Sequence, residues 1–182
     1  NEDIFVLGGY DTESNPLSSV LKYSPETNAW TEIKPMNEAR ASLETVTLNN
    51  KIYAIGGTNK YSVECYDPST DEWTYVASTD AKHHYGSATV HQNKIFVLSS
   101  HNFEMYDPQS NKWTILPKSP IGWGSQLVSI NDKLWTTGGG KSPSDGALIK
   151  SMFEYDVSKK TWTQLPDIDV LRKNHRALIV NF

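Results

Sequence analysis

The sequence predicts an all-β fold in which small antiparallel sheets repeat around an axis, which is the architecture of a β-propeller. A Tyr stands seven residues before a Trp four times along the chain, as Tyr66 does before Trp73. An apolar stretch that ends in a pair of small residues precedes each Tyr, as residues 52–57 show. The steps between the repeated Trp residues are 43, 40 and 49 residues, a period typical of propeller blades.

Sixteen strands follow from the apolar runs and the turn residues that separate them. They are expected at residues 4–9, 18–24, 29–34, 40–48, 51–57, 61–67, 72–77, 84–91, 94–99, 102–107, 112–116, 123–130, 133–138, 149–156, 161–165 and 175–181. Four strands for each of four repeats predict a propeller of four blades with four antiparallel strands each.

The phase of the repeat predicts how the ring closes. The chain ends almost where it starts within the repeat, so residues 175–181 are expected to pair into the first blade and remove its open edge. The predicted domain is a single unit over residues 1–182, with repeats at 1–39 plus 175–182, 40–82, 83–121 and 122–174. The alternative is that these four blades belong to a larger, six-bladed ring.

The repeated residues have structural roles by default. Glycine pairs let the backbone turn where a side chain would clash, and the large rings of Tyr and Trp fill the wedge between neighbouring sheets. The residues assigned to this scaffold are Gly8, Gly9, Tyr23, Trp30, Gly56, Gly57, Tyr66, Trp73, Tyr106, Trp113, Gly138, Gly139, Tyr155 and Trp162. The third repeat departs from the pattern, because Ser99 and Ser100 stand where the others have glycines.

Composition excludes several classes of function. The net charge of −4 argues against nucleic acid as a partner, and no run of 18 apolar residues exists to span a membrane. One cysteine, Cys65, and the lack of a glycosylation sequon favour a cytoplasmic location. No metal or cofactor is expected, since adjacent residues such as His83 and His84 face opposite ways on a strand.

Three stretches of the second repeat carry a resemblance to a known family. Residues 35–40 (PMNEAR), 51–57 (KIYAIGG) and 62–68 (SVECYDP) resemble the kelch repeats of animal BTB-kelch proteins, and the repeat pattern covers the whole chain. The resemblance implies a ring that binds a peptide segment of a protein partner. It also implies a BTB domain elsewhere in the full protein that docks to a cullin-RING ubiquitin ligase.

The resemblance also implies where a partner binds. The family's contact positions lie just after each glycine pair and at the start of the innermost strand of each blade. Carried onto this sequence, the partner-binding residues are Tyr10, Arg40, Lys60, His83, His84, His101, Phe103, Trp123 and Arg172. Two insertions, Tyr10–Leu17 and Gly140–Leu148, are expected on the same face, where length variation marks functional loops.

Two other functions stay open. The chain could be an actin-binding or scaffolding kelch protein that uses its outer loops. More remotely, it could be a kelch-fold enzyme like the copper radical oxidases, in which a Cys-linked Tyr helps to ligate the metal. The sequence contains no phosphate loop, nucleophile elbow, zinc motif or C-x-x-C pair, so we expect that it is not an enzyme.

Overall fold

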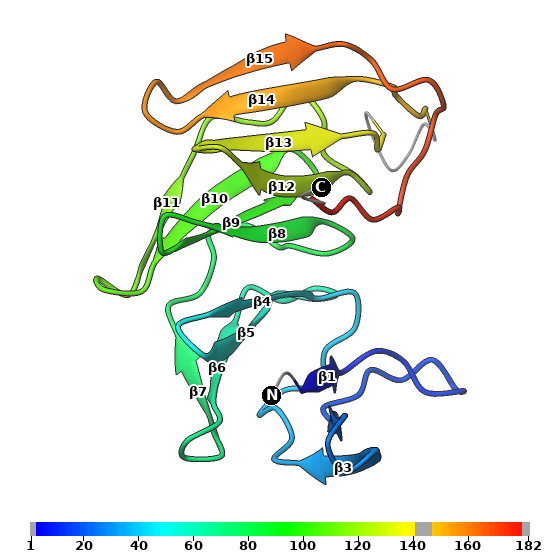
Figure 1. Cartoon of the computed structure of the whole chain (residues 1–182), viewed down its shortest axis with the longest axis vertical. Helices are drawn as coiled ribbons and strands as arrows, with labels where there is room; N and C mark the ends of the chain where they lie inside the picture. The colour runs from blue at the N-terminus through cyan, green and yellow to red at the C-terminus, as the bar shows by residue number, and fades with distance from the viewer. Residues whose placement is uncertain (1–2, 141–146, 180–182) are drawn as a thin grey trace.

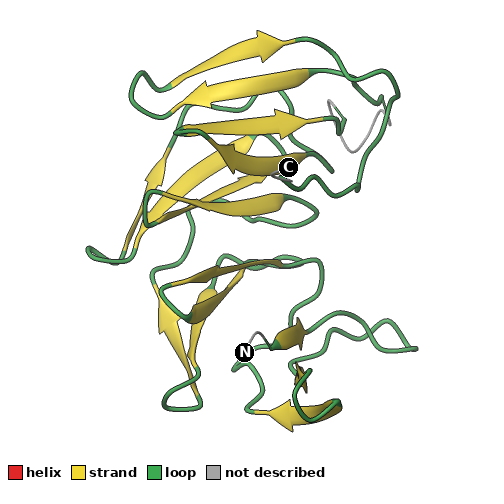
Figure 2. Ribbon diagram, in the orientation of Figure 1, coloured by secondary structure: helices red, strands yellow, loops and turns green. Residues whose placement is uncertain are grey.

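A computed structural model of the chain describes residues 3–140 and 147–179, and these contain strands, turns and loops (Figure 2). None of their segments is a helix long and apolar enough to cross a membrane. The strands form four antiparallel sheets that follow one another in chain order, called blades 1 to 4 below (Figure 1). This is the all-β propeller architecture that the repeats predict.

Blade 1 has three strands among the described residues, and blades 2 to 4 have four each. The strands are β1 (Ile4–Leu7), β2 (Val20–Ser24), β3 (Ala29–Ile33), β4 (Glu44–Leu48), β5 (Lys51–Ile55), β6 (Val63–Asp67), β7 (Glu72–Val76), β8 (Ser87–His91), β9 (Lys94–Ser99), β10 (Asn102–Asp107), β11 (Lys112–Ile115), β12 (Gln126–Ile130), β13 (Lys133–Thr137), β14 (Met152–Asp156) and β15 (Thr161–Leu165).

The innermost strands β4, β8 and β12 begin later than the sequence predicts. They start at Glu44, Ser87 and Gln126 instead of near residues 40, 84 and 123. Just before each strand, one residue takes a positive φ: Ser42 at 54°, Tyr85 at 51° and Gly124 at 66°. This left-handed conformation interrupts the extended backbone, so the chain turns sharply at the axis before the strand can start.

The departure of the third repeat shifts its turn by one residue. In blade 2 the turn after β5 uses Gly56 and Gly57, with φ of 62° and 108°. In blade 3 the positive φ values fall on Ser100 and His101, so Ser99 is added to the end of β9. The strand is longer because the first serine stays extended while its successors turn.

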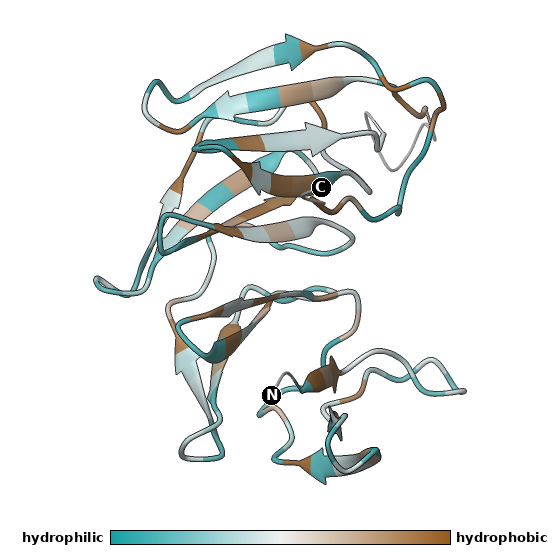
Figure 3. Ribbon diagram, viewed as in Figure 1, coloured by the Kyte–Doolittle hydropathy of each residue, from teal (hydrophilic) through white to brown (hydrophobic). Residues whose placement is uncertain are grey.

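Each hydrophobic core lies between two neighbouring blades. One cluster joins blades 1 and 2, one joins blades 2 and 3, and one joins blades 3 and 4. In Figure 3 apolar residues mark strands such as β1 and β12, while hydrophilic residues mark the turn before β15.

The repeated Trp side chains tie each blade to the preceding one. The indole N–H of Trp73 donates to the carbonyl oxygen of Lys34 at 2.9 Å, and Trp113 donates to Ala77 at 2.7 Å. Trp162 repeats the contact with Pro117 at 3.2 Å. Trp30 is 53% exposed, because no described blade precedes its own.

Closure of the ring by the last strand is not confirmed. Residues 168–179 form no strand, and residues 180 and 181 of the expected strand lie outside the described residues. The segment runs from blade 4 to the axis, where the amide of Gly139 donates to Arg172 and the amide of Asn174 donates to Gly124. Arg176 then lies beside β4, β8 and β12, and β2 is the one described strand paired with β1.

Candidate functional site

Arg40, a predicted contact residue, is fully buried between blades 1 and 2. Its Nε and Nη2 donate to the Glu64 carboxylate at 3.1 and 3.0 Å, and its Nη1 donates to the carbonyl of Gly56 at 2.7 Å. Ser62 accepts two more bonds from the guanidinium. The prediction that Arg40 meets a partner is therefore corrected, because all five N–H donors are used inside the fold.

His83 takes the equivalent place between blades 2 and 3 and is also fully buried. Its Nε2 lies 2.9 Å from the Glu104 carboxylate, which also accepts from the backbone amides of Asp80 and Ala81. The linker that enters blade 3 is thereby fixed to β10. His83 has a packing role, which corrects its assignment to a partner surface.

Phe103 requires the same correction. It is 1% exposed, and its ring meets Tyr155 and Trp162 of blade 4 at centroid distances of 4.9 and 5.1 Å. Phe103 is the second residue after the shifted turn of Ser100 and His101, and its ring belongs to the core between blades 3 and 4.

The other predicted contact residues reach the surface to different degrees. Tyr10 is 47% exposed, and its hydroxyl lies 3.1 Å from the hydroxyl of Thr58 in the neighbouring blade. Lys60 forms a partly buried ion pair with Glu38 at 2.6 Å. The first contact holds the insertion of blade 1 against the turn of blade 2, and the second holds the linker between the two blades against the same turn.

The predicted contact residues of blades 3 and 4 lie in or beside the segments that connect one blade to the next. The Nδ1–H of His101 donates to the carbonyl oxygen of Ser119 at 2.8 Å, and His84 is half-buried. The ring of Trp123 lies under the ammonium of Lys173 at 4.3 Å, and Arg172 is exposed. Most of the insertion after Gly140, residues 141–146, lies outside the described residues.

The structure places a different set of residues on the axis, two positions after the predicted ones. The amide of Tyr85 donates to the carbonyl of Ser42 at 3.4 Å, and the amide of Gly124 donates to Tyr85 at 3.1 Å. The amide of Asn174 continues the series to Gly124 at 2.9 Å. Equivalent residues of successive repeats are thus linked from blade to blade around the axis.

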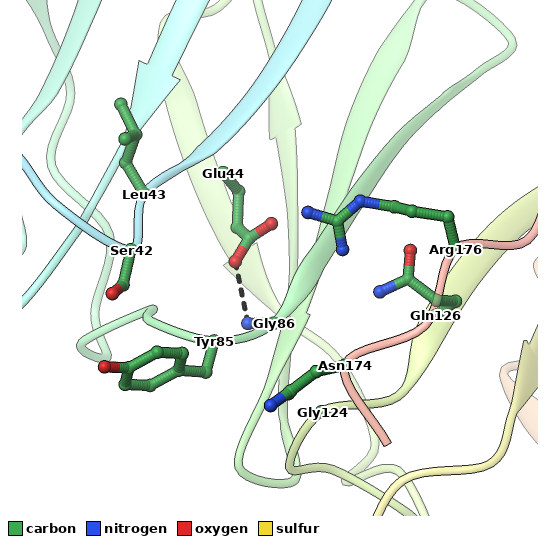
Figure 4. Close-up of a pocket in the computed structure, with 9 residues that line it drawn as sticks. All are labelled: Ser42, Leu43, Glu44, Tyr85, Gly86, Gly124, Gln126, Asn174 and Arg176. Atoms are coloured by element: carbon green, nitrogen blue, oxygen red, sulfur yellow. Dashed lines mark hydrogen bonds between the residues drawn. The ribbon is translucent and has the colours of Figure 1, made fainter. Parts of the chain in front are cut away.

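These residues line a pocket, called the axial pocket below, of about 290 Å³ (Figure 4). Its lining consists of Ser42, Leu43, Glu44, Tyr85, Gly86, Gly124, Gln126, Asn174 and Arg176. A second cavity of about 340 Å³ continues along β4, β8 and β12 and shares Glu44, Gln126 and Arg176 with it. Three blades and the C-terminal segment therefore build one polar hollow.

Two charged side chains line the axial pocket, and the guanidinium of Arg176 points toward the carboxylate of Glu44 (Figure 4). The Glu44 carboxylate accepts from the amide of Gly86 at 2.7 Å. Burial raises the pKa of Glu44 to about 7, against the opposing effects of that hydrogen bond and of the Arg176 charge. Glu44 can therefore change its charge near neutral pH.

A signal for this shift of two residues was present in the sequence. Glu64 and Glu104 stand two residues before the repeated Tyr in the two repeats that begin with Arg40 and His83. The fourth repeat has Gly122 and Phe153 at these positions, so it lacks both the cation and the carboxylate. A basic residue at the start of a repeat thus occurs together with a Glu before its Tyr, which indicates that the basic residue contacts that Glu inside the fold.

Cys65 belongs to a hydrophobic core of the propeller, where its thiol lies beside the hydroxyl of Tyr53. The thiol is buried in the core between blades 2 and 3, and burial raises its pKa. Within residues 3–140 and 147–179, no three His, Cys, Asp or Glu side chains gather as metal ligands would.

The fold and the axial pocket define a β-propeller with a ligand-sized hollow on its axis. A family model described as the Kelch motif matches residues 1–37, 39–79 and 124–168. The chain belongs to this kelch family. The repeat outside the match is the third, which lacks the glycine pair.

Several known proteins share the pattern. Kelch-like protein 36 of Rattus norvegicus is 28% identical over 173 residues, which cover 85% of this chain and 27% of that protein. Kelch domain-containing protein 7A of Mus musculus is 39% identical over 99 residues, 52% of this chain and 12% of that protein. The chain thus spans about a quarter or less of these relatives' lengths. The similarity to these kelch proteins supports a kelch module for protein–protein interaction.

A solved structure shows the same fold. The structure titled "Structure of YjhT" has a TM-score of 0.75 and 17% identity, and the match covers 93% of this chain and 64% of that one. At this identity the likeness concerns the arrangement of blades alone.

Proposed function

We propose that this chain recognises a segment of a partner protein at the axial pocket. The observation that carries the proposal is the series Ser42, Tyr85, Gly124 and Asn174, which brings one position of each repeat to the axis. The positions vary in chemistry while the scaffold around them repeats. Variable residues on a constant framework are typical of recognition surfaces.

The face that bears the pocket also supports the proposal. Each innermost strand is antiparallel to the next strand of its blade, so it begins at the face where strands such as β5 end. Tyr10, which follows the end of β1, therefore presents its exposed ring on the same face as the pocket. Aromatic side chains of this kind are common anchors in protein interfaces.

In the full-length protein we propose that the module selects substrates for a cullin-RING ubiquitin ligase, in the cytoplasm. The kelch-like relatives support this role, and their greater length leaves room for a domain that docks to the ligase. Purification of the full-length gene product from cells should recover a cullin. Recovery of filamentous actin without a cullin would favour the scaffold alternative.

Peptide display tests the recognition step itself. Random peptides selected on the wild-type chain should lose roughly tenfold or more in affinity for Tyr85→Ala, because interface aromatics carry large shares of binding energy. A control variant, Lys112→Gln, changes an exposed side chain of β11. Peptides that bind wild type and Tyr85→Ala equally, or no enriched peptides, would contradict the proposed site.

A further inference from the structure

The axial pocket holds one acceptor and one donor of opposite charge, and the two do not pair. Among the described residues, no ion pair within 4.0 Å joins Arg176 to a carboxylate. Arg176 has one weak bond from Nη1 to the carbonyl of His175 at 3.3 Å, and Glu44 has its bond from the amide of Gly86. Both groups keep bonding capacity that faces the hollow (Figure 4).

A ligand that fills this gap must offer an acceptor to Arg176 and a donor to Glu44. We propose that the axial pocket binds the side-chain carboxamide of a Gln or Asn in the partner segment, with its oxygen toward Arg176 and its NH₂ group toward Glu44. The proposal deepens the proposed function and rests on it, since it names the group that the recognition site reads.

Charge balance favours a carboxamide over the charged alternatives. A carboxylate would face Arg176 favourably but would repel the ionised Glu44, and an ammonium would do the reverse. A neutral amide satisfies both groups, the half-buried Glu44 and the exposed Arg176, without adding a charge that would lose hydration in the pocket. Glu44 and Arg176 are the charged residues among the lining of both cavities.

The seat of Arg176 is set by close packing of the C-terminal segment. The backbone at Gly124 has a φ of 66°, and a Cβ added there would lie 2.7 Å from Oδ1 of Asn174. Asn174 donates its amide to the Gly124 carbonyl at 2.9 Å. Glycine therefore allows the segment that carries Arg176 to cross the end of blade 4.

The test uses three blocked amino acids with matched backbones. They are N-acetyl-glutamine-N-methylamide, the glutamate analogue and the lysine analogue, each titrated into the labelled chain and followed by NMR at the amides of Tyr85, Gly86 and Gly124. At pH 8 the glutamine compound should produce saturable shifts, with affinity roughly tenfold or more above either charged analogue, because each charged analogue meets a like charge at Glu44 or at Arg176. Binding of the glutamate analogue should improve as the pH falls below about 7, where Glu44 gains a proton.

Two variants assign the ends of the amide. Glu44→Gln can still accept from Gly86, and it should weaken the glutamine compound several-fold while strengthening the glutamate analogue at pH 8. Arg176→Gln should weaken both compounds. Lys112→Gln, which alters exposed β11, is the control and should change neither affinity.

Several results would overturn the inference. They are the absence of saturable shifts with the glutamine compound, equal binding of all three compounds, or a preference for glutamate at pH 8. Failure of the carboxamide proposal can be distinguished from failure of the proposed function. Displayed peptides that depend on Tyr85 but lack any required Gln or Asn would leave protein recognition standing and remove the carboxamide. The expected order of NMR affinities, without any enriched peptide in the display experiment, would support carboxamide binding and contradict protein recognition.

Discussion

Two junctions between blades use the same carboxylate position with different partners. Between blades 1 and 2, Arg40 and Glu64 share a network in which every guanidinium donor is bonded. Between blades 2 and 3, His83 makes one bond to Glu104, and its buried Nδ1 has no hydrogen-bond partner. The comparison shows that one scaffold position tolerates a permanent charge only where the surrounding carbonyls are arranged to satisfy it.

The largest effect is expected at the arginine junction. Replacing Glu64 by Gln should lower the free energy of unfolding by roughly 3–5 kcal/mol, because it leaves the buried charge of Arg40 without its counter-ion. Urea unfolding followed by circular dichroism measures the loss. Glu72→Gln removes a carboxylate from an exposed ion pair with Lys34 and should cost less than about 1 kcal/mol. Equal losses for the two variants would mean that Arg40 finds other partners.

A smaller effect is expected at the histidine junction. Glu104→Gln should cost roughly 1–3 kcal/mol, because an amide oxygen can still accept a bond, and His83 makes one bond to the carboxylate where Arg40 makes two to Glu64. The same urea experiment ranks the two variants. A loss at Glu104 as large as that at Glu64 would contradict the ranking of the two junctions.

The smallest expected effect is the loss of the stabilising contribution of Glu104 at acidic pH. Burial by itself would raise the pKa of Glu104, but the hydrogen bonds from His83 and from the amides of Asp80 and Ala81 outweigh it and lower the pKa below the ordinary 4.5. A carboxyl with a lowered pKa stabilises the fold above its ordinary value and loses that contribution as the pH falls through the lowered one. The stability difference between wild type and Glu104→Gln should therefore stay constant above about pH 5 and shrink below 4.5. A difference that is unchanged down to pH 3 would exclude this linkage.

The sequence contained most of the fold because the repeat is local. Each blade is a run of neighbouring strands, so the spacing of Tyr66 and Trp73 and the glycine pair of residues 56 and 57 are enough to place its turns. The position of the innermost strand could not be read as well, since it depends on a positive φ at ordinary residues such as Ser42 and Tyr85. That conformation is imposed by contacts between blades.

The site prediction was wrong for residues that are buried by a partner far away in the sequence. Arg40 looks like a surface cation until Glu64, twenty-four residues later, is placed beneath it by the pairing of β5 and β6. The axial pocket is also nonlocal, because Glu44 and Arg176 are 132 residues apart in the sequence. Closure stayed a prediction for the same reason, since the last segment lies beside β4, β8 and β12.

The short strand β1 presents one edge without a hydrogen-bonded neighbour among the described residues. Its side chains Ile4 and Val6 are 55% and 47% exposed, so the strand combines free backbone groups with apolar surface. An edge of this kind is a template for further pairing, and proteins usually protect it with charge, proline or a covering segment. In concentrated solution β1 is therefore the edge at which copies of this chain would associate by strand pairing. Replacing Val6 with lysine is the substitution expected to prevent it.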